Sequence, residues 1–147
     1  MGVNIFVYGT LMFPEVVKDI TGKSFAIEDA VLHGYIRLEK LPKWNFMSGP
    51  AIIQRENTSV EGKVLIAVDD KSLEIFDFFE GSEYVRRHVT VLVGNNGMEV
   101  MVYFASEELK HRLGEVWDPK IYKETSLEIH RRNIIPEFLK ELRKQNG

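Results

Sequence analysis

The sequence feature that most constrains the fold is a turn between two runs rich in β-branched residues. The tripeptide Asn95-Asn96-Gly97 separates residues 84–93 from residues 98–105. Asn and Gly accept the positive φ angles that tight hairpin turns need, and β-branched residues favour strands. The sequence therefore predicts two long antiparallel strands joined by a short turn.

Further strands are predicted at residues 4–8, 30–36, 51–55 and 60–68, where apolar residues form short runs or alternate with polar ones. Residues 41–50 hold two prolines, Trp44, Phe46 and Gly49, and are expected to form an ordered loop with aromatic contents.

Three helical regions are expected. The first begins at Pro14 and ends near Gly22, and the second spans residues 71–80 between an aspartate cap at 69–70 and Gly81. The third follows Asp118-Pro119 and is expected to be interrupted at Pro136. This order of elements disfavours regular βαβ alternation and favours a single α+β domain with a curved, mixed or largely antiparallel sheet.

Composition excludes several classes of protein. The 147 residues suffice for one domain, and the net charge of −3 does not favour nucleic acid as a partner. The chain has no cysteine, which rules out disulfides and thiolate chemistry. No apolar run approaches the ~20 residues of a membrane span. Residues 1–6 fit neither a signal peptide nor a myristoylation motif, so the expected location is the cytoplasm.

Glu80 is the first candidate for chemistry. On helical spacing it shares a face with Leu73 and Phe76, and Gly81 ends the helix directly after it. Burial on this apolar face and the negative end of the helix dipole both raise the pKa of a carboxyl group, which suits proton transfer near neutral pH. The simpler alternative is an ion pair between Glu80 and Arg86 or Arg87 at the helix end.

Two other acids lie close to Glu80 in the sequence. Glu83 follows the glycine, is expected to be more exposed, and competes with Glu80 for the same role. Asp77 could be a partner carboxylate, although a surface position on the helix is the simpler interpretation.

A second candidate is the turn Tyr8-Gly9-Thr10-Leu11, which follows the first predicted strand. It lacks the additional glycines and the Lys-Ser or Lys-Thr pair of a phosphate-binding loop. Its backbone N–H groups at Gly9, Thr10 and Leu11 could still hold one carboxylate or one oxyanion. Taken alone, the turn is better interpreted as an ordinary tight turn with a structural role.

Other site types have little support. The histidines at 33, 88, 111 and 130 lack the spacing of metal ligands, and no serine has the surroundings of a nucleophile elbow. Arg86, Arg87 and His88 form a basic cluster, but one such cluster on an acidic chain is weak evidence for nucleic-acid binding.

Taken together and in order, several segments resemble the gamma-glutamylcyclotransferase-like family, especially the branch of plant avirulence-induced-gene-like proteins and gamma-glutamylamine cyclotransferase. The resemblance runs from about Phe6 to Phe138. The matching segments are Val7-Tyr8-Gly9-Thr10-Leu11, Pro50-Ala51-Ile52-Ile53, Val60-Glu61-Gly62-Lys63-Val64, Phe76-Asp77-Phe78-Phe79-Glu80-Gly81, Glu83-Tyr84-Val85-Arg86-Arg87 and Trp117-Asp118. Phe76 stands where the family usually has leucine.

The resemblance implies a small barrel-like α+β fold and the conversion of a γ-glutamyl amine, amide or peptide to 5-oxoproline and a free amine. It places the catalytic role on Glu80 rather than Glu83, and substrate binding on Tyr8, Gly9, Thr10, Leu11, Tyr84 and, by a looser match, Tyr122. Such a reaction needs no metal and no organic cofactor, because the substrate's own α-amine is the nucleophile. The alternative is a non-catalytic small-molecule-binding or regulatory module of the same fold.

Overall fold

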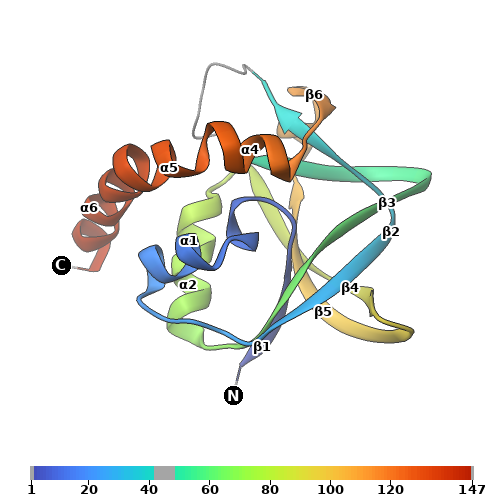
Figure 1. Cartoon of the computed structure of the whole chain (residues 1–147), viewed down its shortest axis with the longest axis horizontal. Coiled ribbons are helices and arrows are strands. Elements are labelled where there is room, and N and C mark those ends of the chain that lie inside the picture. Colours follow the sequence, from blue (N-terminus) through green and yellow to red (C-terminus); the bar gives the residue numbers. More distant parts are fainter. Residues whose placement is uncertain (1, 42–48, 147) are drawn as a thin grey trace.

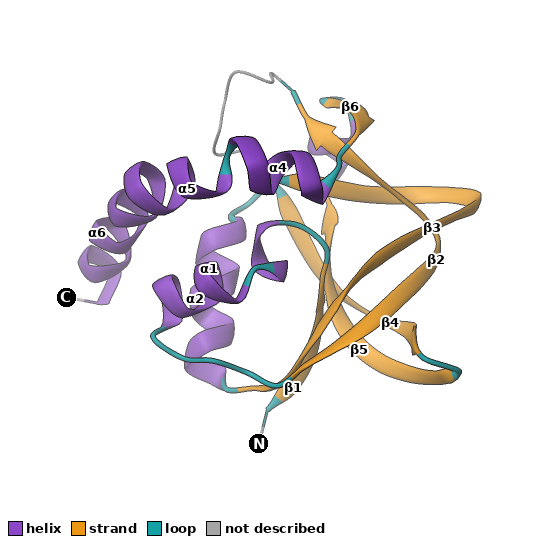
Figure 2. Ribbon diagram, in the orientation of Figure 1, coloured by secondary structure: helices purple, strands orange, loops and turns teal. Residues whose placement is uncertain are grey.

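A computed structural model describes residues 2–41 and 49–146 of the chain. Most of the loop expected at residues 41–50 lies outside these described residues. Strands curve around one side of the molecule and helices gather on the other, so the single domain has the predicted α+β architecture (Figures 1 and 2).

The strands form a mixed sheet that closes on itself. Their order is β3-β1-β5-β4-β2-β6, and a further pairing between β3 and β2 completes a barrel-like ring. All pairs are antiparallel except β1 with β5. The strands are β1 (Val3–Val7), β2 (Ile27–Lys40), β3 (Pro50–Val68), β4 (Tyr84–Val93), β5 (Asn96–Ala105) and β6 (Leu113–Val116). The barrel-like mixed sheet is therefore confirmed.

The helical segments surround one end and one flank of this barrel (Figure 1). They are η1 (Thr10–Met12), α1 (Pro14–Thr21), α2 (Asp70–Glu80), α3 (Glu107–Lys110), α4 (Pro119–Thr125), α5 (Leu127–Ile129), the π-helical turn η2 (His130–Ile134) and α6 (Ile135–Asn146).

The predicted boundaries of the two helices with strong local signals are confirmed to within one residue. Helix α1 has Pro14 at its start and ends at Gly22, whose φ of 75° is a left-handed cap that favours glycine. Helix α2 begins after Asp69, whose Oδ2 accepts a hydrogen bond from the Ser72 amide at 3.1 Å, and it ends at Gly81.

The hairpin forms, but its turn lies one residue earlier than predicted. Val93 pairs with Asn96, so the turn residues are Gly94 and Asn95. Gly94 has a φ of 62°. A glycine with positive φ in the first turn position is the arrangement of type II′ hairpins, which explains why the tripeptide 95–97 is not itself the turn.

The strands predicted at 51–55 and 60–68 are one continuous strand, β3. Its pairing with β2 shifts register between His33 and Tyr35, where residues 55–58 bulge outward. Thr58 holds the bulge by donating from Oγ1 to the Tyr35 and Arg55 carbonyls at 2.8 and 2.7 Å. Strand β2 is also longer than residues 30–36, while α3 and β6 were not predicted at all.

Pro136 does not interrupt the last helix. The helical path continues from α5 through η2 into α6, and the widened turn directly before Pro136 absorbs the disturbance. In this turn the Ile135 amide donates to the His130 carbonyl, five residues earlier. Proline provides no N–H and crowds the carbonyl four residues before it, so a local π turn is a physically reasonable adjustment.

Strand β1 separates the core into two parts by its alternation. Ile5 and Val7 face the cluster formed with the helices, whereas Phe6 and Tyr8 face the barrel interior. Phe76 of α2 is fully buried in the helical cluster. The end of β1 and the end of α2 are thereby packed around the same core, and this brings the turn after β1 close to Glu80.

Candidate active site

A cavity of about 100 Å³ lies between the barrel strands and the helices. Its walls come from the end of β1, the ends of β2 and α2, the starts of β3 and β4, and the C-terminal helices. All residues to which the family resemblance assigns catalysis or substrate binding line it, namely Tyr8, Gly9, Thr10, Leu11, Glu80, Tyr84 and Tyr122. The fold therefore brings these separate segments together, while their roles in binding or catalysis stay a prediction.

The turn after β1 offers backbone donors to this cavity. Its internal hydrogen bonds run from Met12 N–H to the Gly9 carbonyl at 3.0 Å and from Phe13 N–H to the Thr10 carbonyl at 3.3 Å. Both donors lie beyond Leu11. Within the described chain, the amides of Gly9, Thr10 and Leu11 donate to no backbone carbonyl, so they could bind an anion.

Close packing explains the glycine in this turn. A Cβ atom added at position 9 would lie 2.7 Å from Cδ of Pro50, the first residue of β3. The turn can therefore approach β3 only with glycine at this position.

Glu80 is the last residue of α2 and is partly buried. Burial raises its pKa to about 7, with nearby Lys40 opposing the rise and Asp77 adding to it. The alternative ion pairs are not formed, because no salt bridge links Glu80 to Arg86 or Arg87 in the described chain, and Arg86 lies 3.5 Å from Asp77 instead. A carboxyl group with a pKa near neutrality can both accept and return a proton.

Glu83 lies in a different environment from Glu80. Its carboxylate pairs with Arg112 and lies 3.3 Å from Lys40 Nζ, and its side chain is 40% exposed. Glu83 does not line the cavity. Of the two glutamates, only Glu80 lines the cavity.

Lys40 is a residue that the sequence did not single out. Its side chain is 10% exposed, and its Nζ lies 5.0 Å from the centre of the Tyr84 ring. Burial lowers the pKa of Lys40, while Glu80 raises it. Lys40 lies at the end of a long strand, and no local motif marks it, because pairing between strands carries it to the cavity: its neighbour Glu39 lies opposite Pro50 of β3, and Lys40 lies opposite Leu113 of β6.

Three tyrosine hydroxyls near Glu80 are already bound to the protein. Tyr8 donates to the Tyr103 carbonyl at 2.6 Å, Tyr84 to the Pro50 carbonyl at 2.9 Å, and Tyr103 to Asp77 Oδ1 at 2.6 Å. Burial raises the pKa of Tyr8 and Tyr84 well above the usual value, so both remain neutral phenols. Their rings can form walls of the site, and Tyr103 orients Asp77.

Two structural absences concern the described residues. Within residues 2–41 and 49–146, no group of three or more His, Cys, Asp or Glu side chains is placed to hold a metal ion. In the same part of the chain, no helix has the length and apolar character needed to cross a bilayer.

The raised pKa of Glu80 has a measurable effect on stability. Folding raises this pKa from 4.5 to about 7. The stabilising contribution of protonated Glu80 to the free energy of unfolding is therefore fully present below pH 4.5 and is lost as the pH rises through 7. As the pH rises from 4.5 to 8, the free energy of unfolding of Glu80→Gln is therefore expected to increase by roughly 2 kcal/mol relative to that of the parent chain. Urea unfolding at both pH values measures this difference. Glu83→Gln, which removes ion pairs, should show no such gain, and a pH-independent effect of Glu80→Gln would contradict the assigned pKa.

Comparisons with known proteins show the family of the chain. A sequence model of the family described as gamma-glutamyl cyclotransferase, AIG2-like, matches residues 5–121. Protein AIG2 C of Arabidopsis thaliana is 33% identical over 149 aligned positions, which cover 95% of this chain and 81% of that protein.

Solved structures share the same fold. A solution structure of a protein from Arabidopsis thaliana is 28% identical, with a TM-score of 0.66 and coverage of 99% of this chain and 93% of that one. A structure named gamma-glutamyl cyclotransferase is 16% identical, with a TM-score of 0.66 and coverage of 96% and 86%, and it supports the fold alone. By the family match and the identity to the plant relative, the chain belongs to the gamma-glutamyl cyclotransferase, AIG2-like family.

Proposed function

We propose that this protein is a cyclotransferase that converts a γ-glutamyl amine, amide or peptide to 5-oxoproline and a free amine, with Glu80 as general acid and base. The observation that carries the proposal is that Glu80, with its pKa raised to about 7, lines the same cavity as the Gly9–Leu11 turn, whose amides donate to no backbone carbonyl in the described part of the chain. A proton-transfer group and an anion-binding turn are the two elements that this reaction requires.

The reaction needs no nucleophile from the protein. Glu80 takes a proton from the substrate's α-ammonium, and the freed amine attacks the γ-carbonyl carbon to form the ring C–N bond. Collapse of the tetrahedral intermediate breaks the bond to the leaving nitrogen, to which Glu80 returns the proton. The ring nitrogen then loses its extra proton, and the departing amine gains one and leaves as an ammonium ion, so the protons balance.

The turn would hold the substrate folded for this attack. The amides of Gly9, Thr10 and Leu11 would bind one of two groups, either the α-carboxylate or the oxyanion that forms on the γ-carbonyl oxygen. Correct positioning of amine and carbonyl is worth about 7–11 kcal/mol of the barrier. Rings of Tyr8, Tyr84 and Tyr122 would close the walls around the ligand.

The size of the cavity favours a small acyl group. Its volume of about 100 Å³ is well below the ~300–1,000 Å³ of pockets for drug-sized ligands. A cavity of this size fits the γ-glutamyl group, with the leaving amine directed outward.

A panel of γ-glutamyl compounds with different leaving amines tests the proposal. We expect 5-oxoproline and free amine in equal amounts from at least one compound, and none from its N-acetylated counterpart, whose amine cannot attack. Adding a chelator should leave the rate unchanged. The non-catalytic alternative predicts that 5-oxoproline or glutamate binds while no compound on the panel is turned over.

A further inference from the structure

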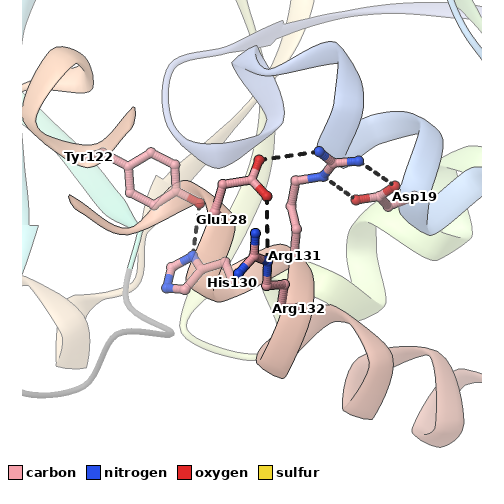
Figure 3. A network of polar contacts seen from close by, with 6 residues as sticks. All are labelled: Asp19, Tyr122, Glu128, His130, Arg131 and Arg132. Carbon is pink, nitrogen blue, oxygen red and sulfur yellow. Dashed lines mark hydrogen bonds and ion pairs between the residues drawn. The ribbon is translucent and has the colours of Figure 1, made fainter. Parts of the chain in front are cut away.

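His130 is a buried histidine that the proposed reaction does not yet use. Its side chain is 5% exposed and lines the same cavity as Glu80, although it comes from the C-terminal helical region. One ring nitrogen, Nδ1, lies 2.8 Å from the hydroxyl of Tyr122, another residue of the cavity (Figure 3). The other, Nε2, is buried without a hydrogen-bond partner in the part of the chain that the structure describes.

An unpaired buried nitrogen normally costs stability. Native proteins leave few such groups, and each calls for an explanation such as a ligand or a catalytic role. His130 is also the first residue of the π-helical turn η2, and π turns within helices are frequent at functional sites. The position of His130 on the cavity, its burial and the missing partner together indicate that Nε2 is available to hydrogen-bond with a bound molecule.

The hydrogen bond to Tyr122 determines which nitrogen carries the proton. Burial raises the pKa of Tyr122 and lowers the pKa of His130, so both groups are neutral near pH 7. If Tyr122 donates to Nδ1, the single imidazole proton is on Nε2 and only that group lacks a partner. If Nδ1 donates instead, both the Tyr122 proton and the Nε2 lone pair lack partners. The first arrangement is therefore favoured, and Nε2 is a donor.

Ion pairs fix the backbone that carries His130. Arg131, the next residue, donates from Nε to Asp19 Oδ2 at 2.8 Å and from Nη2 to Asp19 Oδ1 at 3.3 Å, which ties η2 to α1 (Figure 3). Glu128 receives a further contact from Arg131 Nη1 at 3.3 Å. Such a two-point Arg–carboxylate pair is directional, so it limits rotation of the π turn and helps hold the imidazole in place.

We propose that His130 is a substrate-binding residue whose Nε2–H donates a hydrogen bond to an oxygen of the bound γ-glutamyl group. This inference rests on the proposed function, because it takes its ligand from that reaction. The acceptor is a carboxylate or a carbonyl oxygen, the two kinds of acceptor that such a ligand presents. Tyr122 acts as a positioning residue that sets the tautomer of His130.

Two substitutions separate this role from a structural one. The amide of glutamine reaches the place of Nε2, whereas that of asparagine reaches only the place of Nδ1. His130→Asn should keep a partner for Tyr122 and lose the donor, so we expect its dissociation constant for 5-oxoproline to rise about 10- to 100-fold. His130→Gln should remain within a few-fold of the parent chain. The opposite ranking, measured by calorimetry on variants with the parent melting temperature, would overturn the proposal.

The unmodified protein provides an independent readout. Nitrogen-15 NMR of the histidine rings should show His130 with its proton on Nε2, and that resonance should shift when 5-oxoproline is added. A proton found on Nδ1 would overturn the proposal even if both variants fail to fold. A parent chain that turns over γ-glutamyl compounds but is unaffected by His130→Asn refutes only the role of His130. A parent chain that neither binds nor turns them over refutes the proposed function itself.

The two possible acceptors are distinguished by 2-pyrrolidinone, the same lactam ring without the carboxylate. If the acceptor is the carbonyl oxygen, His130→Asn weakens binding of both lactams. If it is the carboxylate, only the binding of 5-oxoproline is weakened. Equal affinities of the parent chain and His130→Asn for both compounds would exclude a contact with either group.

Discussion

Glu80→Gln is expected to lower kcat for 5-oxoproline formation by about 10²- to 10⁴-fold, the usual contribution of a general acid or base. Glutamine keeps the shape of the side chain and removes only its ability to take and return a proton. The dissociation constant for 5-oxoproline and the fold should change little. Steady-state kinetics measures kcat, titration calorimetry measures the dissociation constant, and circular dichroism checks that the variant keeps its fold.

Glu83→Gln is the matched control, because it makes the same chemical change three residues further along the chain. Glu83 does not line the cavity, and its carboxylate pairs with Arg112 and Lys40, so its loss should affect kcat much less. If Glu83→Gln abolished turnover while Glu80→Gln retained it, the catalytic residue would be Glu83 and not Glu80.

Phe76→Ala is expected to cost about 3–5 kcal/mol of stability, the usual result of removing a fully buried phenylalanine. Phe76 is completely buried on the core face of α2, and its ring packs edge-on against Phe25 at 6.4 Å between centroids. The ring anchors the helix whose last residue is Glu80. Urea unfolding at a single pH gives the loss directly.

Phe78→Ala provides the comparison for this effect on the same helix. Phe78 is 37% exposed, and the centroid of its ring lies 5.5 Å from that of Phe138. Its truncation should therefore lower the free energy of unfolding clearly less than that of Phe76. Equal losses for the two variants would mean that the buried face of α2 does not anchor the helix as described.

Features determined by neighbouring residues could be predicted from the sequence. Asp69 and Gly81 mark the ends of α2 by capping chemistry, and the spacing of Leu73, Phe76 and Glu80 shows which face of the helix packs inward. These are local effects of backbone hydrogen bonding and helical period, which a single segment contains in full. The position of Glu80 on the cavity followed from them.

Features that depend on distant pairing could not be predicted. Lys40 reaches the cavity because β2 pairs with β3 over most of its length, and Tyr103 because β5 lies beside β1. The spacing of the histidines along the chain bears only on metal binding, so it contains no signal for the role of a single buried imidazole. His130 meets Tyr122 through the path of the C-terminal helices, and the nearby Pro136 gave the sole local signal of an irregularity there.

The central claim is that Glu80 drives cyclisation of a γ-glutamyl group, and product analysis across pH tests it most directly. A γ-glutamyl compound is incubated with the parent chain and with Glu80→Gln between pH 5 and pH 9, and 5-oxoproline, glutamate and free amine are quantified. The account predicts one 5-oxoproline per amine, with kcat/KM rising as Glu80 ionises through an apparent pKa of about 7, and almost no product from the variant. Release of glutamate in place of 5-oxoproline, or equal turnover by the variant, would contradict it.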